Sequence, residues 1–208
     1  MKPRFRRRPD HLVSNHRRSL SGFIVWRVLS MISGTVVIGG LTVVSWEYDG
    51  LNVLLRARLA LALELIDRYD PRLARRLRRD VRGIWIIPAW RTHWNIRTRA
   101  IALDLRRETR NTVEDLALTL VHEATHARHH ALGVRYDGKQ ARAEAACIRA
   151  SMEFADRLGP GQVSYRPSLD ALDDPWWTPE KHAAQAAEAH EILGMPPFMS
   201  GILRRGGK

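Results

Sequence analysis

Two histidines and a glutamate stand at a spacing that could hold and use a metal ion. The sequence reads His122-Glu123-Ala124-Thr125-His126. In an α-helix, residues four apart lie on one face, so both imidazoles can turn toward the same ion. Zinc accepts neutral imidazoles, and a catalytic zinc keeps one position open for water. Glu123 follows His122 directly but is not on the helix face that the two histidines share. It would therefore lie near the ion without binding it, which suits a general base. The pattern therefore predicts a zinc site.

A catalytic zinc needs a third protein ligand. The extended pattern with a histidine six positions further along fails, because Leu132 stands there. We expect Glu144 to be the ligand, since it lies on a predicted helix that can pack against the first. Glu153 competes, but nine positions turn it to nearly the opposite face of that helix. Asp137 is a third candidate with a simpler role in a turn, and Cys147 is expected to be a small buried residue.

The chain before the motif predicts helices and strands. An apolar stripe that includes Leu54 and Leu61 predicts a helix over Leu51–Tyr69. A shorter helix is expected over Pro71–Val81, where many arginines indicate a solvated face.

Two strands are expected next. Compact or alternating apolar runs predict them over Ile84–Ile87 and Arg99–Leu105, joined by the loop Ala89–Trp94. Arg106–Arg110 is then expected to be a polar link.

The motif itself is predicted to lie on a helix. Asn111 or Thr112 caps this helix, and Gly133 ends it. A further helix is expected over Gln140–Leu158, and another over Thr178–Leu193. The predicted buried stripe of the Gln140–Leu158 helix consists of Ala141, Ala145, Ile148, Met152, Ala155 and Leu158. The fold class is therefore α+β, with a short sheet packed on the motif helix and a ligand helix after it.

The N-terminal part of the chain is basic first and apolar next. The window Phe23–Leu41 is long enough to span a membrane, which predicts an anchor or a membrane-surface segment with the N-terminus inside. The β-branched runs 35–38 and 41–44 are equally typical of strands, so a disordered basic arm followed by strands is the alternative. The first strand could lie within Gly40–Asp49 under either interpretation. An anchor would put the domain outside the membrane, and its absence would make the protein cytoplasmic.

These patterns divide the chain into three parts. Residues 1–40 form the basic and apolar extension, residues 41–194 the metallohydrolase domain, and residues 195–208 a basic tail. The net charge of +12 is compatible with an anionic membrane surface, with nucleic acid or with an arginine-rich proteome. We expect a peptide or protein substrate, with membrane association through the N-terminus, and we do not expect nucleic acid as a partner. One cysteine excludes an internal disulfide.

The motif followed by a helix bearing Glu144 resembles the gluzincin branch of the zincin metallopeptidases, over about residues 81–158. The resemblance implies a small single-domain zincin-like form, with Zn²⁺ held by His122, His126 and Glu144. It also implies that Glu123 is catalytic and that the edge of a strand holds an extended peptide. Ile148 departs from the family, which often has an acidic residue there, and the chain lacks the large C-terminal lobe of the thermolysin-like enzymes. Four residues could supply the oxyanion-stabilising group of that family: Tyr136, Tyr165, His182 and His190.

The sequence thus favours a zinc-dependent hydrolase, and within that class a metallopeptidase. One alternative is a protein that keeps a zinc site without catalysis. The other is a basic module that binds membranes or nucleic acid and carries the motif by coincidence.

Overall fold

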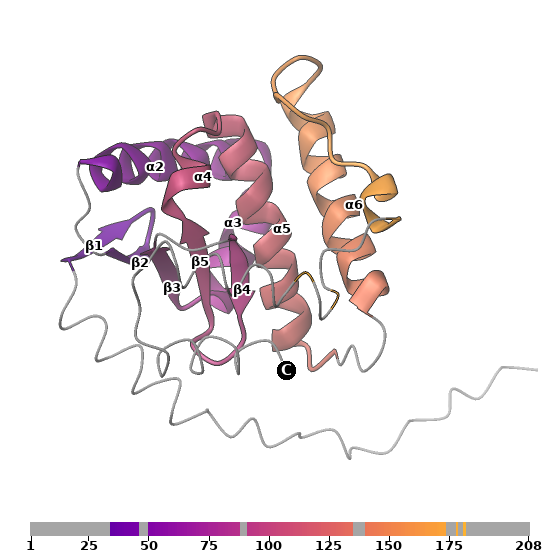
Figure 1. Ribbon diagram of the computed structural model, residues 1–208, viewed down its shortest axis with the longest axis horizontal. Coiled ribbons are helices and arrows are strands. Elements are labelled where there is room, and N and C mark those ends of the chain that lie inside the picture. Colours follow the sequence, from indigo (N-terminus) through magenta and orange to yellow (C-terminus); the bar gives the residue numbers. More distant parts are fainter. Residues whose placement is uncertain are drawn as a thin grey trace, which may run out of the picture.

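The computed structural model describes residues 34–45, 50–87, 91–134 and 140–173, together with positions 178 and 181. These residues form one mixed sheet of five strands with five α-helices and a short 3-10 helix. Figure 1 shows the sheet on the left, α5 beside it, and α6 beyond α5. The prediction of an α+β fold is confirmed at this level.

The sheet is parallel in its centre and antiparallel at both edges. Its spatial order is β1-β2-β3-β5-β4, in which β2, β3 and β5 are parallel. Both β1 and β4 run antiparallel to their neighbours. The strands are β1 (Gly34–Ile38), β2 (Leu41–Ser45), β3 (Gly83–Ile87), β4 (His93–Asn95) and β5 (Ala100–Asp104).

A two-residue turn joins β1 to β2. Gly39 and Gly40 both have positive φ, at 54° and 82°, as the tight turns of β-hairpins require. A Cβ on Gly39 would also come within 2.8 Å of the Leu63 side chain, so this turn packs directly against α2.

Three helices cover one face of the sheet. They are α2 (Leu51–Tyr69), α3 (Pro71–Asp80) and α5 (Val113–Ala131). A short helix α4 (Leu105–Glu108) follows β5, and α6 (Gln140–Leu158) packs on α5. The 3-10 helix η1 (Leu169–Leu172) closes the described part of the chain against α6.

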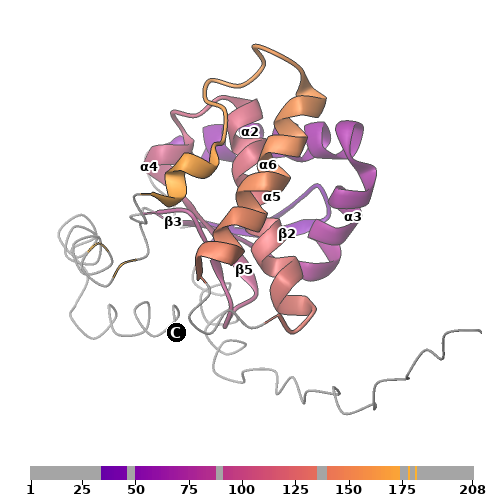
Figure 2. The same ribbon diagram turned by 90° about the vertical axis from the view of Figure 1, so that its right-hand side faces the viewer.

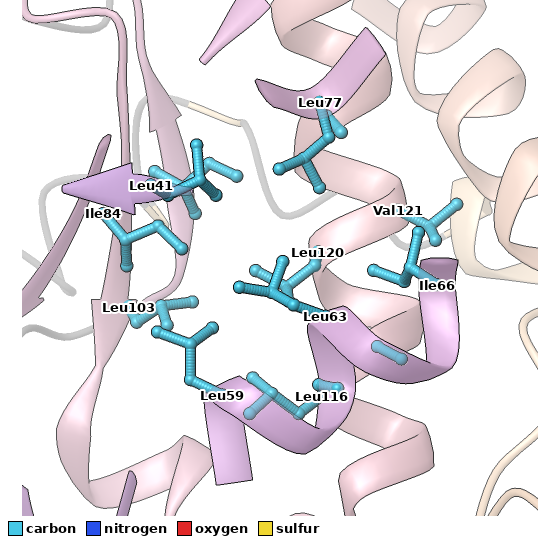
Figure 3. Close-up of a cluster of buried hydrophobic side chains, with 14 of the residues drawn as sticks. Leu41, Leu59, Leu63, Ile66, Leu77, Ile84, Leu103, Leu116, Leu120 and Val121 are labelled. Carbon is cyan, nitrogen blue, oxygen red and sulfur yellow. The ribbon is translucent and has the colours of Figure 1, made fainter. Parts of the chain in front are cut away.

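The core lies between the sheet and these three helices. Every second residue of a strand points to one face, so Ile84 and Ile86 enter this core while Trp85 joins a smaller cluster on the other face. Figure 3 shows strand residues such as Leu103 facing α2 and α5. Leu120 of α5 lies at the centre of this cluster and is fully buried. The helix that carries the motif is therefore anchored by the main core of the domain.

Several predicted elements are confirmed, among them the bounds of α2 and α6 and the start and end of α5. Thr112 is the N-cap of α5, and its side chain accepts a hydrogen bond of 3.1 Å from the backbone of Asp115. Gly133 ends the helix region with a φ of 70°. In the predicted final helix, the structure describes only Thr178 and Lys181, whose hydrogen bond is that of a first turn.

Other predictions differ from the structure. The predicted loop Ala89–Trp94 overlaps β4, and the predicted polar link after β5 begins as α4. Leu51, Leu54 and Leu61 are exposed rather than part of the buried stripe of α2. Of the predicted buried stripe of α6, Ile148, Ala155 and Leu158 are buried, whereas Ala141 is exposed and Ala145 and Met152 are half-buried. The buried face also includes Glu144, Cys147 and Ser151.

The N-terminal strands bear on whether the apolar window 23–41 is a membrane segment or part of the sheet. Gly34–Ile38 belongs to the sheet, although we assigned it to the extension over residues 1–40. The strand interpretation of residues 35–38 and 41–44 is therefore confirmed. Residues 23–33 and the tail over 195–208 lie outside the described residues. Among the helices that the structure describes, none combines the length and apolarity needed to cross a membrane.

The central position of α5 leads to a prediction about stability. Leu120→Ala should lower the free energy of unfolding by about 2–5 kcal/mol, because it opens a cavity in the main core. Leu61→Ala is the matched control, since Leu61 is 50% exposed and its loss should change stability by only about 0.5 kcal/mol. Urea unfolding followed by circular dichroism measures both. Equal losses of unfolding free energy in the two variants would contradict the assignment of Leu120 to the core.

Candidate metal centre

The candidate centre lies between two helices that run side by side. Figures 1 and 2 both show α6 packed against α5. The interface is apolar toward the C-terminal end of α6, where Phe154 is 1% exposed. Near the start of α6 it is polar, and here His122 and His126 of α5 meet Glu144 of α6. Packing of the apolar part brings these polar side chains together.

Glu144 lies against both histidines of the motif. Its Oε2 is 3.3 Å from Nε2 of His122, and its Oε1 is 3.3 Å from Nε2 of His126. The two imidazole rings are 5.0 Å apart between centroids and inclined at 65°. The Glu144 side chain is only 2% exposed. A carboxylate is thus held inside the protein by two imidazoles from one face of α5.

Cys147 belongs to the same group of side chains. The donor atoms of Cys147, His122 and His126 all lie within 4.8 Å of one another. We predicted Cys147 as a small buried residue without a role in the site; it is fully buried, but it lies at the centre. Its position three residues after Glu144 puts both on one helix face, which is the signal that could have identified it. Thiolate sulfur is a common zinc ligand, so Cys147 is a second candidate for the third ligand beside Glu144, which does not belong to the group within 4.8 Å.

The donor set suits zinc by its chemistry. Glu144 contacts each histidine at 3.3 Å through a different oxygen, as in direct contacts between a carboxylate and two imidazoles. Two imidazoles with a carboxylate or a thiolate are also donors that zinc prefers over magnesium or calcium. The residues therefore fit the metal that the motif predicts.

The charges of the chain reinforce this arrangement. Burial would raise the pKa of Glu144, but hydrogen bonds from His122 and His126 outweigh it and lower that pKa to about 2. Burial would lower the pKa of His126, but hydrogen bonds with Cys147 and Glu144 outweigh it and raise that pKa. Burial raises the pKa of the Cys147 thiol. Glu144 is thus ionised, whereas His126 and the Cys147 thiol must each lose a proton before they can bind a metal.

A pocket of about 380 Å³ opens above the centre, and His122, Glu123 and Glu144 are among its lining residues. Glu123 is only 7% exposed, yet its side chain reaches this pocket, which is the position a general base requires. Cys147 is not among the lining residues and lies beneath it.

One wall of the pocket comes from the segment after α6. Ser164 donates through its backbone N–H to Asp115 at 3.0 Å and through its hydroxyl to the same carboxylate. This contact ties the segment to the first turn of α5. Tyr165 follows directly and lines the pocket, where its phenol is hydrogen-bonded to Thr119. Tyr165 is the one of our four oxyanion candidates that the structure describes.

The opposite wall is held by a buried carboxylate. Glu108 of α4 accepts hydrogen bonds from Thr92 at 2.6 Å and from Asn111 at 2.8 Å. The backbone N–H of Asp104 donates to Thr92 at 3.0 Å. These bonds join the segment before β4 to α4, and they position Arg91 and other side chains of this wall at the pocket.

The structure describes one of the other two ligand candidates. Glu153 is exposed on α6, and Asp137 lies outside the described residues. Comparisons with protein-family models, with curated proteins and with solved structures find no match for this chain.

The geometry predicts the metal content of the protein and its variants. After dialysis against zinc, the wild type should retain about one equivalent, because the donors match a zinc site. His122→Ala and Glu144→Ala should each weaken zinc binding by at least about 100-fold, since each removes a donor. Glu153→Ala is the matched control on the same helix and should bind normally. Plasma mass spectrometry together with competition by a chromophoric chelator measures both quantities.

Cobalt distinguishes the two donors on α6. We expect Glu144 to be the third ligand, because it is ionised and 3.3 Å from each imidazole. The cobalt-loaded protein should then lack the near-ultraviolet charge-transfer band of a cobalt–thiolate bond. A strong band that is lost in Cys147→Ser would assign the third ligand to Cys147 instead.

Proposed function

We propose that this protein is a zinc-dependent hydrolase, and specifically a metallopeptidase with a small zincin-like domain. One observation carries the proposal. The buried carboxylate of Glu144 lies 3.3 Å from each histidine of the motif, directly below the pocket that Glu123 lines. A coincidental motif on a surface helix would not require a buried acid from another helix at this point.

The arrangement of the sheet supports a peptide as the substrate. β4 is the last strand at its edge of the sheet and pairs with β5 on one side, within the described residues. It also contacts α5. An extended peptide can add to such an edge by main-chain hydrogen bonds, as it does in other peptide-binding proteins. This would lay the peptide beside the helix that bears the histidines.

The residues around the pocket have distinct roles in this proposal. His122, His126 and Glu144 hold the zinc, which when bound would polarise the scissile carbonyl and make a water more acidic. Glu123 takes the proton from the attacking water and later delivers it to the leaving amine. Tyr165 donates its phenol hydrogen to the oxygen of the carbonyl as negative charge develops there.

The alternative is a zinc site that serves structure alone. Cys147 favours it, because a fourth protein donor would close the coordination sphere as in structural zinc sites. Under this alternative the pocket above the centre would have no catalytic role.

Replacement of the proposed base separates catalysis from metal binding. Glu123→Gln should lower the rate of peptide hydrolysis by about 10²–10⁴-fold, because the amide cannot accept the proton. It should leave one zinc equivalent bound, since Glu123 is not a ligand. Mass spectrometry of a mixed peptide substrate after incubation measures cleavage. Glu114→Gln, on the same helix, is the control and should keep full activity; a chain that binds zinc but never cleaves a peptide would favour the structural alternative.

The phenol of Tyr165 provides a second test. Tyr165→Phe should lower kcat by about 10²–10³-fold with little change in KM, because its hydrogen bond forms mainly in the transition state. Steady-state kinetics on a cleaved peptide give both constants. An unchanged kcat would remove Tyr165 from the proposed mechanism.

A further inference from the structure

The wall of the pocket that faces the motif helix is positively charged. Arg91, from the segment before β4, and Arg107, from α4, both line it. They lie close enough that the charge of Arg107 lowers the pKa of Arg91. Two guanidinium groups beside each other repel, and a bound anion would relieve this repulsion.

Arg91 is also near the reaction centre. Its side chain is half-buried, and Glu123 and Glu144 both act on it electrostatically. Burial, followed by the charge of Arg107, lowers its pKa to about 10, so it remains protonated at neutral pH. A group bound to Arg91 would therefore lie next to the bond that Glu123 is proposed to act on.

Arg107 is held in place at its backbone, and its charge is available. The Asp104 side chain caps α4 by accepting hydrogen bonds from the backbone N–H groups of Arg106 and Arg107, at 3.0 and 3.4 Å. The guanidinium of Arg107 makes no ion pair with any residue in the part of the chain that the structure describes. Arg106 and Arg110 are equally exposed neighbours that do not line the pocket.

The acids of the pocket already have other partners. Glu108 accepts hydrogen bonds from Thr92 and Asn111, and Glu144 lies between the two histidines. The charge of Arg107 acts on Glu108 and on Asp104, but neither carboxylate forms an ion pair with it among the described residues. The remaining lining includes apolar side chains of α5, α6 and η1, such as Leu118, Ile148 and Leu172. The pocket thus offers a cationic wall beside an apolar surface.

We propose that Arg91 and Arg107 bind a carboxylate of the substrate, so that the protein acts on peptides with an acidic group next to the scissile bond. Arginine suits this role because its planar fork matches the two oxygens of a carboxylate. The carboxylate could belong to an Asp or Glu side chain or to the C-terminus of the peptide. This inference rests on the proposed function, whose pocket and reaction centre it uses.

Binding to a variant that cannot turn over tests the inference apart from catalysis. The full chain carrying Glu123→Gln is titrated, with added zinc and 0.15 M salt, against fluorescent peptide mixtures with Glu or Gln at the central positions. Each mixture is made with a free C-terminal carboxylate and with a C-terminal amide. If a side-chain carboxylate is recognised, fluorescence anisotropy should show about tenfold tighter binding of the Glu mixture than of the Gln mixture. If the C-terminal carboxylate is recognised, the free acid should bind about tenfold more tightly than the amide.

Further substitutions separate the two arginines from the overall charge of +12. Adding Arg107→Gln or Arg91→Gln should reduce the preference to about twofold or less, whereas Arg106→Gln and Arg110→Gln should leave it unchanged. Arg107→Lys retains the charge but loses the planar fork, so it should retain only part of the preference. A preference between those of the wild type and Arg107→Gln would show that the loss does not come from misfolding.

Equal binding of acidic and neutral peptides would overturn the inference, and so would a failure to bind any of them. Equal losses from Arg106→Gln and Arg107→Gln would also overturn it, because they would show that diffuse charge attracts the peptides. A preference that depends on Arg107, in a protein whose wild type binds zinc but cleaves no peptide, would leave the carboxylate-binding site standing and overturn the proposed function, together with the claim that the bound peptide is cleaved.

Discussion

The rest of the site depends on one buried carboxylate. Glu144 is 2% exposed, and an ionised group at that depth is costly unless charged or hydrogen-bonded partners compensate it. His122 and His126 provide that compensation, each at 3.3 Å from a different oxygen. The same three side chains therefore define both the polar part of the α5–α6 interface and the place where a cation would bind. A cation there would replace the proton that the histidines and the carboxylate otherwise share.

This polar group can be tolerated because apolar packing holds its two helices. On one side, Leu120 and its neighbours fix α5 to the sheet. On the other, Phe154 packs into the main core, and Ser151 donates a hydrogen bond of 3.3 Å to the backbone carbonyl of Leu118. The histidines and Glu144 are thus positioned by contacts outside the centre. Such support is what a site needs if its donors are to keep their geometry while an ion enters or leaves.

The pocket above the centre separates charges between its floor and its wall. Acidic side chains, Glu123 and Glu144, lie at the floor, while Arg91 and Arg107 line the wall beside α4. Glu108 offsets part of that positive charge through its interaction with Arg107, while its oxygens accept hydrogen bonds from Thr92 and Asn111. The electrostatic field in such a pocket favours ligands of one charge sign and one orientation. The same contacts that position Glu123 and Glu144 thus also hold the positive wall beside them.

The sequence by itself determined the elements that local spacing controls. Helical periodicity and end signals set α2, α5 and α6, and the four-residue spacing of the histidines set their common face. It also showed that Glu144 and Glu153 cannot both face the histidines, because nine positions reverse the face of a helix. Tertiary structure alone decided the rest. β4 is three residues long and owes its existence to pairing with β5, so no local pattern revealed it. Arg91 and Arg107 reach the site only through contacts between elements distant in the chain, and that information is carried by packing rather than by spacing.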